Sequence, residues 1–264
     1  MLSIIIVNYN QKNLLKQCLR NISEAKINLE KEIIIVDNAF TAGSKEFLVD
    51  WQKTDPSYQV IFNKENIGYA KANNQGIKAA KGKYILVLNP DVIILPNSVE
   101  AMIDLLKQDT SVGLVGPQLL NLDKTIQDSC RRFPRFYTPL ARRTFLGKWF
   151  FKNELKRYLM LDFDHQRTRE VDWMIGACLA SKKQILEKIG FFDERYFLYL
   201  EDADLAKKIW QLGLKVVYLP KAKMYHFYQR SSGVRNLFCL FKKIIWIHII
   251  SVMKYFLKWG WTKS

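Results

Sequence analysis

The sequence predicts an α/β protein with a Rossmann-like, mostly parallel central sheet flanked by helices and an amphipathic helical extension at the C-terminus. Short β-branched runs alternate with segments of helical periodicity through the first half of the 264 residues. The expected strands are apolar throughout, as is typical of parallel strands buried on both faces. Alternation of this kind favours a doubly wound sheet. Near its end the chain changes to a long apolar pattern with helical spacing.

The expected elements follow from these periods in chain order. Four runs rich in Ile, Val and Leu are expected to be strands: residues 3–7, 33–36, 60–62 and 84–88. Helical spacing of small and apolar residues predicts four helices: residues 13–25, 69–80, 181–189 and 203–212. Gly213 is well placed to end the last of these, and a fifth strand is expected over 215–219.

Polar residues follow three of the expected strands at the point where each strand ends. These endings are Asn8-Tyr9-Asn10, Asp37-Asn38 and Asn89-Pro90-Asp91. Ligands of doubly wound sheets bind at the carboxyl ends of the strands. Three such endings together therefore predict the rim of a binding site.

Positive charge is concentrated in two segments. The 41 basic and 25 acidic residues give a net charge of +16. Residues 131–157 contribute +8 and the residues after Asp204 contribute +12, so the remainder carries about −4. This clustering favours a surface that docks on a membrane, a phosphorylated ligand or a nucleic acid. A nucleic acid fits least, because neither segment contains a recognisable RNA- or DNA-binding module and the acidic residues 191–204 would repel phosphates.

Two common nucleotide-binding motifs do not occur in the sequence. No GxGxxG follows the first expected strand and no GxxxxGK[ST] occurs anywhere, which argues against a nicotinamide enzyme or a P-loop ATPase. The N-terminal apolar run is too short for a signal peptide and is expected to be a strand. The cysteines have no CxxC spacing and are expected to be reduced thiols: Cys18, Cys130, Cys178 and Cys239.

Acids at two strand ends could serve a nucleotide and a metal. Asp37 could accept a hydrogen bond from a base N–H, or it could be a turn or helix-capping residue. Asp91 and Asn89 could approach one divalent ion, although Asn-Pro-Asp is also a common turn. His226 is a further candidate metal ligand. The other histidines are expected to be structural: His165 and His248.

A dense aromatic run over residues 191–200 leads into Glu201, Asp202 and Asp204. Aromatic rings stack on the C–H faces of sugars, and carboxylates accept hydrogen bonds from sugar hydroxyls, so the run is typical of a sugar-binding surface. The same acids would also be favourable in the first turn of a helix that starts near Glu201.

Seven stretches and His226 recur in one order over residues 1–230: IIIVNYN at 4–10, IVDN at 35–38, NIGYAKANN at 66–74, LNPD at 88–91, WMIGAC at 173–178, GFFDERYF at 190–197 and YLEDADL at 199–205. In sequence and spacing they resemble the family 2 glycosyltransferases. Within that family the chain is most similar to the rhamnosyltransferase-like branch, which builds bacterial surface polysaccharides.

The resemblance implies a GT-A fold, an inverting sugar transfer and a divalent metal, Mg²⁺ or Mn²⁺. It implies that Asp202 is the catalytic base and that Asp37 holds the base of the nucleotide donor. The expected donor-binding residues are Asn8, Asp37, Asn66, Asn89 and Asp91. The expected acceptor-binding residues are Trp173, Gly176, Asp193 and Glu201.

The metal ligands implied by the resemblance are Asp91 and His226. Asp91 stands at the second acid of the family's DxD motif. Asn89 stands where the first Asp would be and offers one charge fewer. The metal is therefore expected to bind weakly, or only together with the donor diphosphate.

The segment 236–261 is expected to form an amphipathic helix with its polar residues on an arc of about 80°. These residues are Asn236, Lys243, Ser251, Lys254 and Lys258. The longest apolar run, 244–253, is too short to span a bilayer, which favours a helix lying on the membrane surface. The alternative is a helix packed on the catalytic domain. The basic segment 131–157 could share that membrane surface or face a lipid diphosphate.

Together these inferences predict a catalytic domain over 1–230 and a basic, membrane-associated helix over 231–264. Residues 1–115 would form the nucleotide-sugar half and residues 116–230 the acceptor half. The expected activity is transfer of a sugar, rhamnose from a dTDP donor, to a lipid-linked or polysaccharide acceptor at the inner face of the plasma membrane. The rival hypotheses are a catalytically idle sugar-binding homologue and a nucleic-acid-binding protein.

Overall fold

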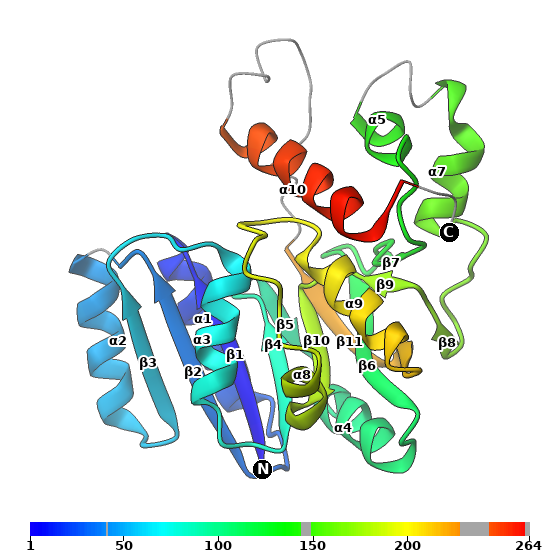
Figure 1. Ribbon diagram of the computed structural model, residues 1–264. Coiled ribbons are helices and arrows are strands. Elements are labelled where there is room, and N and C mark those ends of the chain that lie inside the picture. The colour runs from blue at the N-terminus through cyan, green and yellow to red at the C-terminus, as the bar shows by residue number, and fades with distance from the viewer. Residues whose placement is uncertain (41, 144–148, 228–242, 262–264) are drawn as a thin grey trace.

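A nine-stranded sheet forms the centre of the computed structural model, which describes residues 1–40, 42–143, 149–227 and 243–261 (Figure 1). The strands are β1 Leu2–Asn8, β2 Lys31–Asn38, β3 Tyr58–Asn63, β4 Tyr84–Leu88, β5 Val92–Ile94, β6 Val112–Leu120, β8 Arg169–Glu170, β10 Cys178–Lys182 and β11 Lys215–His226. They lie in the order β3-β2-β1-β4-β10-β6-β11-β5, and β8 pairs with β11.

Most of these strands run in one direction. β3, β2, β1 and β4 are parallel to their neighbours, as β6 is to β11, and the antiparallel β10 joins the two groups. The strands expected at 3–7, 33–36, 60–62 and 84–88 are confirmed. The strand expected at 215–219 continues to residue 226, so His226 ends a strand instead of following one.

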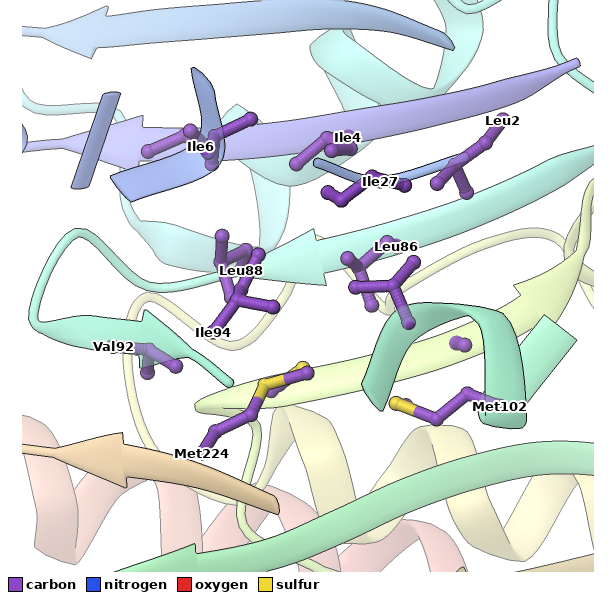
Figure 2. Close-up of a cluster of buried hydrophobic side chains, with 14 of the residues drawn as sticks. Leu2, Ile4, Ile6, Ile27, Leu86, Leu88, Val92, Ile94, Met102 and Met224 are labelled. Atoms are coloured by element: carbon purple, nitrogen blue, oxygen red, sulfur yellow. The ribbon is translucent and has the colours of Figure 1, made fainter. Parts of the chain in front are cut away.

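Side chains of the sheet alternate between two apolar cores, one on each face. Ile4 and Ile6 of β1 pack with Leu86 and Leu88 of β4 in one core (Figure 2). Ile5, between them in sequence, belongs to the core on the opposite face. All seven residues of β1 are buried. Because both faces are covered, the strand is a continuous apolar run in the sequence.

Helices cover both faces of the sheet. They are α1 Lys12–Glu24, α2 Ala42–Thr54, α3 Tyr69–Ala79, α4 Ser98–Gln108, α5 Thr138–Arg143, α7 Lys152–Leu159, α8 Lys183–Lys188, α9 Glu201–Gln211 and α10 Lys243–Trp259. Residues of α1, α2 and α4 belong to the first core, and residues of α3, α8 and α9 to the second. The helix expected over 181–189 begins only at Lys183, because Ser181 and Lys182 belong to β10.

The basic segment 131–157 folds around one acid. It contains α5, most of α7 and β7 (Cys130–Arg131), which pairs with β9 (Trp173–Met174). The Glu154 carboxylate is buried, accepts a hydrogen bond from the Thr138 hydroxyl, and pairs with Arg157 at 2.8 Å and Arg135 at 3.5 Å. Part of the segment's charge is therefore neutralised inside the protein.

Helix α10 packs on the rest of the protein, as the alternative for this segment predicted. Tyr255 and Phe256 are buried in the second core. Ser251 Oγ donates to the Leu198 carbonyl oxygen at 2.8 Å, and Lys258 Nζ lies 2.7 Å from Asp204 Oδ1. Residues 236–242 of the expected helix lie outside the described residues. Among the described residues, none belongs to a helix long and apolar enough to cross a bilayer.

Three residues of the polar arc of α10 contact the protein, while Lys243 is exposed. Ser251 is buried, Lys258 pairs with Asp204 and Asp193, and Lys254 Nζ donates to the Arg195 carbonyl oxygen. The side exposed to solvent instead carries four large apolar residues: Trp246, Ile250, Met253 and Leu257. At 100° per residue these four lie within an arc of about 60°. The amphipathic pattern was therefore predicted correctly, but the buried side combines apolar residues with part of the polar arc, and the exposed side carries an apolar stripe that an ordinary surface helix would lack.

Candidate functional site

A cavity of about 670 Å³ gathers most of the predicted site residues. Its lining residues lie at the ends of β4 and β11, in the β7–β9 sheet, at the start of α9 and in α10. The predicted residues in its lining are Asn89, Asp91, Trp173, Gly176, Glu201, Asp202 and His226. A second hollow of about 640 Å³, beside Asp172 and Lys215, contains none of the predicted residues.

Asp91 and His226 lie together although 135 positions separate them in the chain. β11 pairs antiparallel with β5, which places His226 opposite Val92. The Phe227 N–H donates to the Asp91 carbonyl oxygen at 2.9 Å. As a result His226 Nε2 lies 3.6 Å from Asp91 Oδ2. The two predicted metal ligands are therefore brought to one wall of the cavity.

Gln127 fixes the tautomer of His226. Its side-chain nitrogen donates to the His226 and Asn121 oxygens, both at 2.8 Å, so its amide oxygen faces His226 Nδ1 at 2.9 Å. Nδ1 therefore carries the proton, and Nε2 presents its lone pair toward Asp91. Burial lowers the pKa of His226 to about 4, which keeps the ring neutral. A neutral imidazole held in this way is suited to metal ligation.

The residues present fit a divalent metal. Asp91 Oδ1 is buried and has no hydrogen-bond partner in the structure, and such an oxygen is costly unless a ligand uses it. Burial raises the pKa of Asp91 to about 6, which a bound cation would reverse. Within the described residues no group of three or more His, Cys, Asp and Glu gathers around one point. The protein would thus supply two ligands and leave the others to substrate phosphates.

Tyr69 links Asn89 to the opposite wall. Its hydroxyl lies 2.8 Å from Asn89 Oδ1 and 2.9 Å from the Gly176 carbonyl oxygen, and its single proton serves one of them at a time. Burial raises the pKa of Tyr69 well above its usual value, so the hydroxyl remains a donor. Asn89 lines the cavity beside Asp91 with its side-chain oxygen in contact with Tyr69.

The first turn of α9 holds two neighbouring carboxyl groups, Glu201 and Asp202, whose pKa values are both raised. Asp202 Oδ2 accepts from the Gly176 N–H at 2.9 Å and its Oδ1 from the Ala203 N–H at 2.8 Å. Burial raises the pKa of Asp202 to about 6, against the opposing effect of these N–H bonds. Burial, followed by the charge of Asp202, raises the pKa of Glu201 well above its usual value. Two backbone N–H donors favour the ionised form of Asp202, whereas burial and the charge of Asp202 favour the neutral form of Glu201.

The backbone before these acids is strained. Tyr199 and Leu200 both have left-handed conformations, with φ of 73° and 67°. Neither is glycine, so each is expected to cost about 1 kcal/mol or more. Gly68, at φ 91°, supports the same loop: the next residue, Tyr69, donates its N–H to the Phe197 carbonyl oxygen at 2.7 Å. A Cβ on Gly68 would lie 2.8 Å from that oxygen, so only glycine fits.

Three predicted donor-binding residues lie at the carboxyl ends of the neighbouring strands, outside the cavity lining. Asp37 is buried and accepts from Asn8 Nδ2 and from Ser44 Oγ, both at 2.7 Å. Asn66 Oδ1 accepts from Asn38 Nδ2 at 2.8 Å. These contacts hold the side chains along one edge of the sheet, because β1, β2 and β3 are parallel neighbours.

One predicted acceptor-binding residue is held elsewhere. Asp193 lies outside the cavity lining and pairs with Arg195 at 2.6 Å and Lys258 at 2.8 Å. Arg195 and then Lys258 hold the pKa of Asp193 well below its usual value. Its carboxylate attaches α10 through Lys258, and its predicted acceptor contact stays a prediction. The aromatic run also contributes less than expected: Phe192 and Tyr196 are buried in the core, while Tyr199 lines the cavity.

Several cavity residues were not predicted. Gln127 and Arg131 have no sequence signal that distinguishes them from their polar neighbours. Three residues of α10 also line the cavity, among them His248, whose ring centroid lies 4.9 Å from that of Tyr199. The structural role expected for His165 is supported by its burial beside Tyr218, away from the cavity. Cys18, Cys130 and Cys178 are buried free thiols, as expected, and Cys239 lies outside the described residues.

Comparison with known proteins identifies relatives along most of the chain. The family model "Glycosyl transferase family 2" matches residues 3–190. The N-acetylglucosaminyl-diphospho-decaprenol L-rhamnosyltransferase of Mycobacterium tuberculosis is 27% identical over 244 residues, which is 88% of this chain and 78% of that protein. The amylovoran biosynthesis glycosyltransferase AmsE of Erwinia amylovora is 24% identical over 226 residues, covering 85% and 75% of the two chains.

Two solved structures share the fold at low sequence identity. GalNAc-T7 with UDP, GalNAc and Mn²⁺ superposes with a TM-score of 0.66 at 16% identity, over 89% of this chain and 44% of that one. The mannosyltransferase PcManGT of Pyrobaculum calidifontis, with GDP-Man and Mn²⁺, gives 0.60 at 20% identity, over 87% and 57%. The chain therefore spans about half the length of these structures.

Proposed function

Because the chain belongs to the family 2 glycosyltransferases and has the GT-A fold, we propose that it transfers L-rhamnose from a dTDP donor, with inversion, to a lipid-diphosphate-linked N-acetylglucosamine. Membership makes it a glycosyltransferase, and the activity named for the mycobacterial relative supports this donor sugar and acceptor. The observation that carries the proposal is the placement of Asp202, with two backbone N–H bonds, in the same cavity as Asp91 and His226.

Asp202 is the general base of the proposed reaction. It accepts the proton of the acceptor hydroxyl while the hydroxyl oxygen attacks the anomeric carbon of the donor. The bond between that carbon and the diphosphate oxygen breaks in the same step, which inverts the anomeric configuration. A carboxylate with a pKa of about 6 is ionised at neutral pH and basic enough to take the proton of the hydroxyl. General base catalysis of this kind typically raises the reaction rate about 10²- to 10⁴-fold.

Asp91 and His226 would hold the Mg²⁺ or Mn²⁺. The ion would neutralise the negative charge that develops on the leaving diphosphate. Both structural relatives named above were solved with Mn²⁺, which supports a metal in this fold without placing one here. Asn89 lines the same wall but lacks the negative charge of an Asp. The donor diphosphate would therefore have to supply part of the metal's ligands.

The donor base would lie over the sheet edge formed by Asn8, Asp37 and Asn66. Asp37 has its carboxylate fixed by two neighbours, and each of its oxygens retains a second lone pair for a base N–H. Trp173, Gly176 and Glu201 would face the acceptor, because they line the cavity around Asp202. Burial raises the pKa of Glu201, which favours the neutral carboxyl that can donate a hydrogen bond to a sugar oxygen.

The exposed stripe of α10 would attach the protein to the cytoplasmic face of the plasma membrane. Trp246, Ile250, Met253 and Leu257 are 56%, 46%, 52% and 72% exposed. Exposed apolar patches on a soluble domain are typical of interaction sites, and Trp suits the headgroup zone. In Figure 1, α10 and the basic α5–α7 segment lie at the same end of the molecule. A lipid-linked acceptor requires such a surface beside the cavity.

The test is transfer by the purified protein. It should be stabilised thermally by dTDP-rhamnose with Mn²⁺, more than by UDP or GDP sugars, and should add one deoxyhexose to a synthetic N-acetylglucosaminyl diphospholipid, seen by mass spectrometry. NMR of the product should give the anomeric configuration opposite to that of the donor. Donor binding with no transfer to any glycolipid acceptor would favour the idle sugar-binding homologue. Retention of the anomeric configuration would exclude a single-displacement mechanism.

A further inference from the structure

Arg131 is a buried cation that has no carboxylate at ion-pair distance within the described part of the chain, although the charges of Asp202 and Asp128 act on it from farther away. It lies in β7, lines the cavity and is 7% exposed. One guanidinium nitrogen donates to the Cys130 carbonyl oxygen at 2.7 Å, while Nε is buried with no hydrogen-bond partner. Among the described residues none forms an ion pair with it within 4.0 Å. Buried charges are normally paired, so this guanidinium is suited to an anion that enters the cavity.

The neighbouring arginines of the same segment differ in this respect. Arg132 pairs with Asp172 at 3.0 Å, and Arg135 and Arg157 pair with Glu154. Their charges are satisfied within the protein. Of these four arginines only Arg131 is left to a ligand, and Arg132 provides a matched control one position away.

A second cation lies on the same wall. Arg142 of α5 also lines the cavity, and the guanidinium carbons of Arg131 and Arg142 lie 5.9 Å and 5.3 Å from the Tyr158 ring centroid. After burial, the charge of Arg142 lowers the pKa of Arg131, as expected for two nearby cations. Arg142 thus adds a second positive charge near Arg131, which favours binding of an anion at Arg131.

This wall lies in the acceptor half of the cavity. Arg131 follows Cys130 in the β7–β9 sheet beside Trp173, whereas Asp91 and His226 come from β4 and β11. Val252 and Phe256 of α10 line the same cavity, and the opposite side of α10 carries the exposed apolar stripe. In a sugar–diphosphate–lipid the diphosphate lies between the sugar and the lipid. Its place is therefore on the membrane side of the sugar that Asp202 would contact, and Arg131 and Arg142 line the same cavity as Asp202.

We propose that Arg131 and Arg142 form an anion subsite that binds the diphosphate of the lipid-linked acceptor, separate from the metal-dependent site of the donor diphosphate. The inference rests on the proposed function. Arginine is the side chain best suited to phosphate, because its planar guanidinium donates two parallel hydrogen bonds. The subsite would make the enzyme select diphospholipid acceptors over neutral glycosides of the same sugar.

The test measures binding of geranyl diphosphate, a short isoprenoid diphosphate, by the full chain in EDTA, which removes any metal. Geraniol is the control for the apolar chain. Arg131→Met should weaken geranyl diphosphate binding about tenfold or more, because hydrogen bonds between charged groups are lost. Arg132→Met, with the same loss of charge, should bind it as the wild type does. Arg131→Lys should give an intermediate loss, because a lysine cannot bind bidentately, and it serves as the second variant if the Met protein does not fold.

Binding of Mn²⁺–dTDP distinguishes the two diphosphate sites. Arg131→Met should retain wild-type affinity for it, which also shows that the variant is folded. A wild-type affinity for geranyl diphosphate in both Arg131 variants would overturn the proposal. So would an equal loss of Mn²⁺–dTDP and geranyl diphosphate binding, because Arg131 would then hold the donor. If the wild type binds geranyl diphosphate but no nucleotide sugar, the proposed function fails and the anion subsite stands.

Discussion

Substitution of Asp202 by Asn tests the catalytic assignment and the physical state of the carboxylate together. Asn cannot accept the proton of the acceptor hydroxyl, so kcat should fall by about 10²- to 10⁴-fold. Donor affinity should hardly change, because Asp202 lies on the α9 side of the cavity and the metal pair lies on the β4–β11 wall. The measurement is kcat at saturating donor, with the Kd of Mn²⁺–dTDP determined in parallel.

The pH dependence of kcat in the wild type is a second test of Asp202 as the base. With the pKa of Asp202 raised to about 6 by burial, about one-tenth of the protein carries an ionised base at pH 5. At saturating donor, kcat should therefore fall about tenfold between pH 7.5 and pH 5 and be flat above pH 7. Glu201→Gln is the companion variant: it keeps a neutral side chain of similar shape, the form that the raised pKa of Glu201 favours, and should keep this profile if Asp202 is the base.

The stability of the Asn variant should stay near that of the wild type because two effects oppose. The raised pKa of Asp202 means that the wild type loses stability as pH rises from about 4 to about 6, by about 3 kcal/mol, and Asn removes this loss. In exchange, Asn can accept only one of the two N–H groups of Gly176 and Ala203, which costs about 1–3 kcal/mol. A variant that melts as the wild type does and keeps kcat within threefold would refute the assignment of Asp202 as base, as would a wild-type kcat that is flat down to pH 5.

Other predictions concern the metal and the membrane. Asp91→Ala should weaken the Mn²⁺-dependent part of donor binding about tenfold or more and leave the metal-free part unchanged; identical Mn²⁺ titrations would place the metal elsewhere. Asn89→Asp should tighten Mn²⁺ binding by restoring a charge beside Asp91. Gln127→Leu should remove the hydrogen bond that orients the His226 ring and lower Mn²⁺ affinity about 10- to 100-fold. The affinity is measured by a Mn²⁺ titration followed by fluorescence, and Gln59→Leu on β3 is the distant control. Trp246→Ser with Leu257→Ser should reduce pelleting with anionic liposomes while activity on a water-soluble acceptor is kept; unchanged pelleting would exclude the α10 stripe as the membrane contact. Removal of all residues after Gly233 should instead lower the melting temperature, because Tyr255 and Phe256 leave the core.

Much of the fold followed from the sequence because burial on both faces of a parallel sheet demands continuous apolar strands. Ile4, Ile5 and Ile6 could be assigned to a buried strand without knowing which core each would join. The meeting of Asn8 with Asp37 was also predictable, since parallel neighbours end at one edge of the sheet. Asp202 and Asp91 were found from motifs whose order and spacing are visible in the chain.

Other features depended on long-range pairing that no local pattern encodes. His226 reaches Asp91 only because β11 continues past residue 219 and pairs with β5 in a register that places residue 226 opposite Val92. Gln127 carries no sign in the sequence of its bond to His226. Arg131 and Arg132 are adjacent cations, and successive side chains of a strand point to opposite sides. The pairing of β7 with β9 decides which one lines the cavity and which one meets Asp172.

The C-terminal helix shows the same division most clearly. Its sequence determined that the helix would be amphipathic, because helical spacing fixes which residues share a face. The direction in which each face points was decided by the tertiary structure. Asp193 and Asp204 pair with Lys258 while Tyr255 and Phe256 enter the core, so part of the polar arc lies against the protein and the stripe of Trp246, Ile250, Met253 and Leu257 is left exposed. A helical period specifies only relative directions around an axis, whereas the inward direction is set by the charge and shape of the surface on which the helix packs.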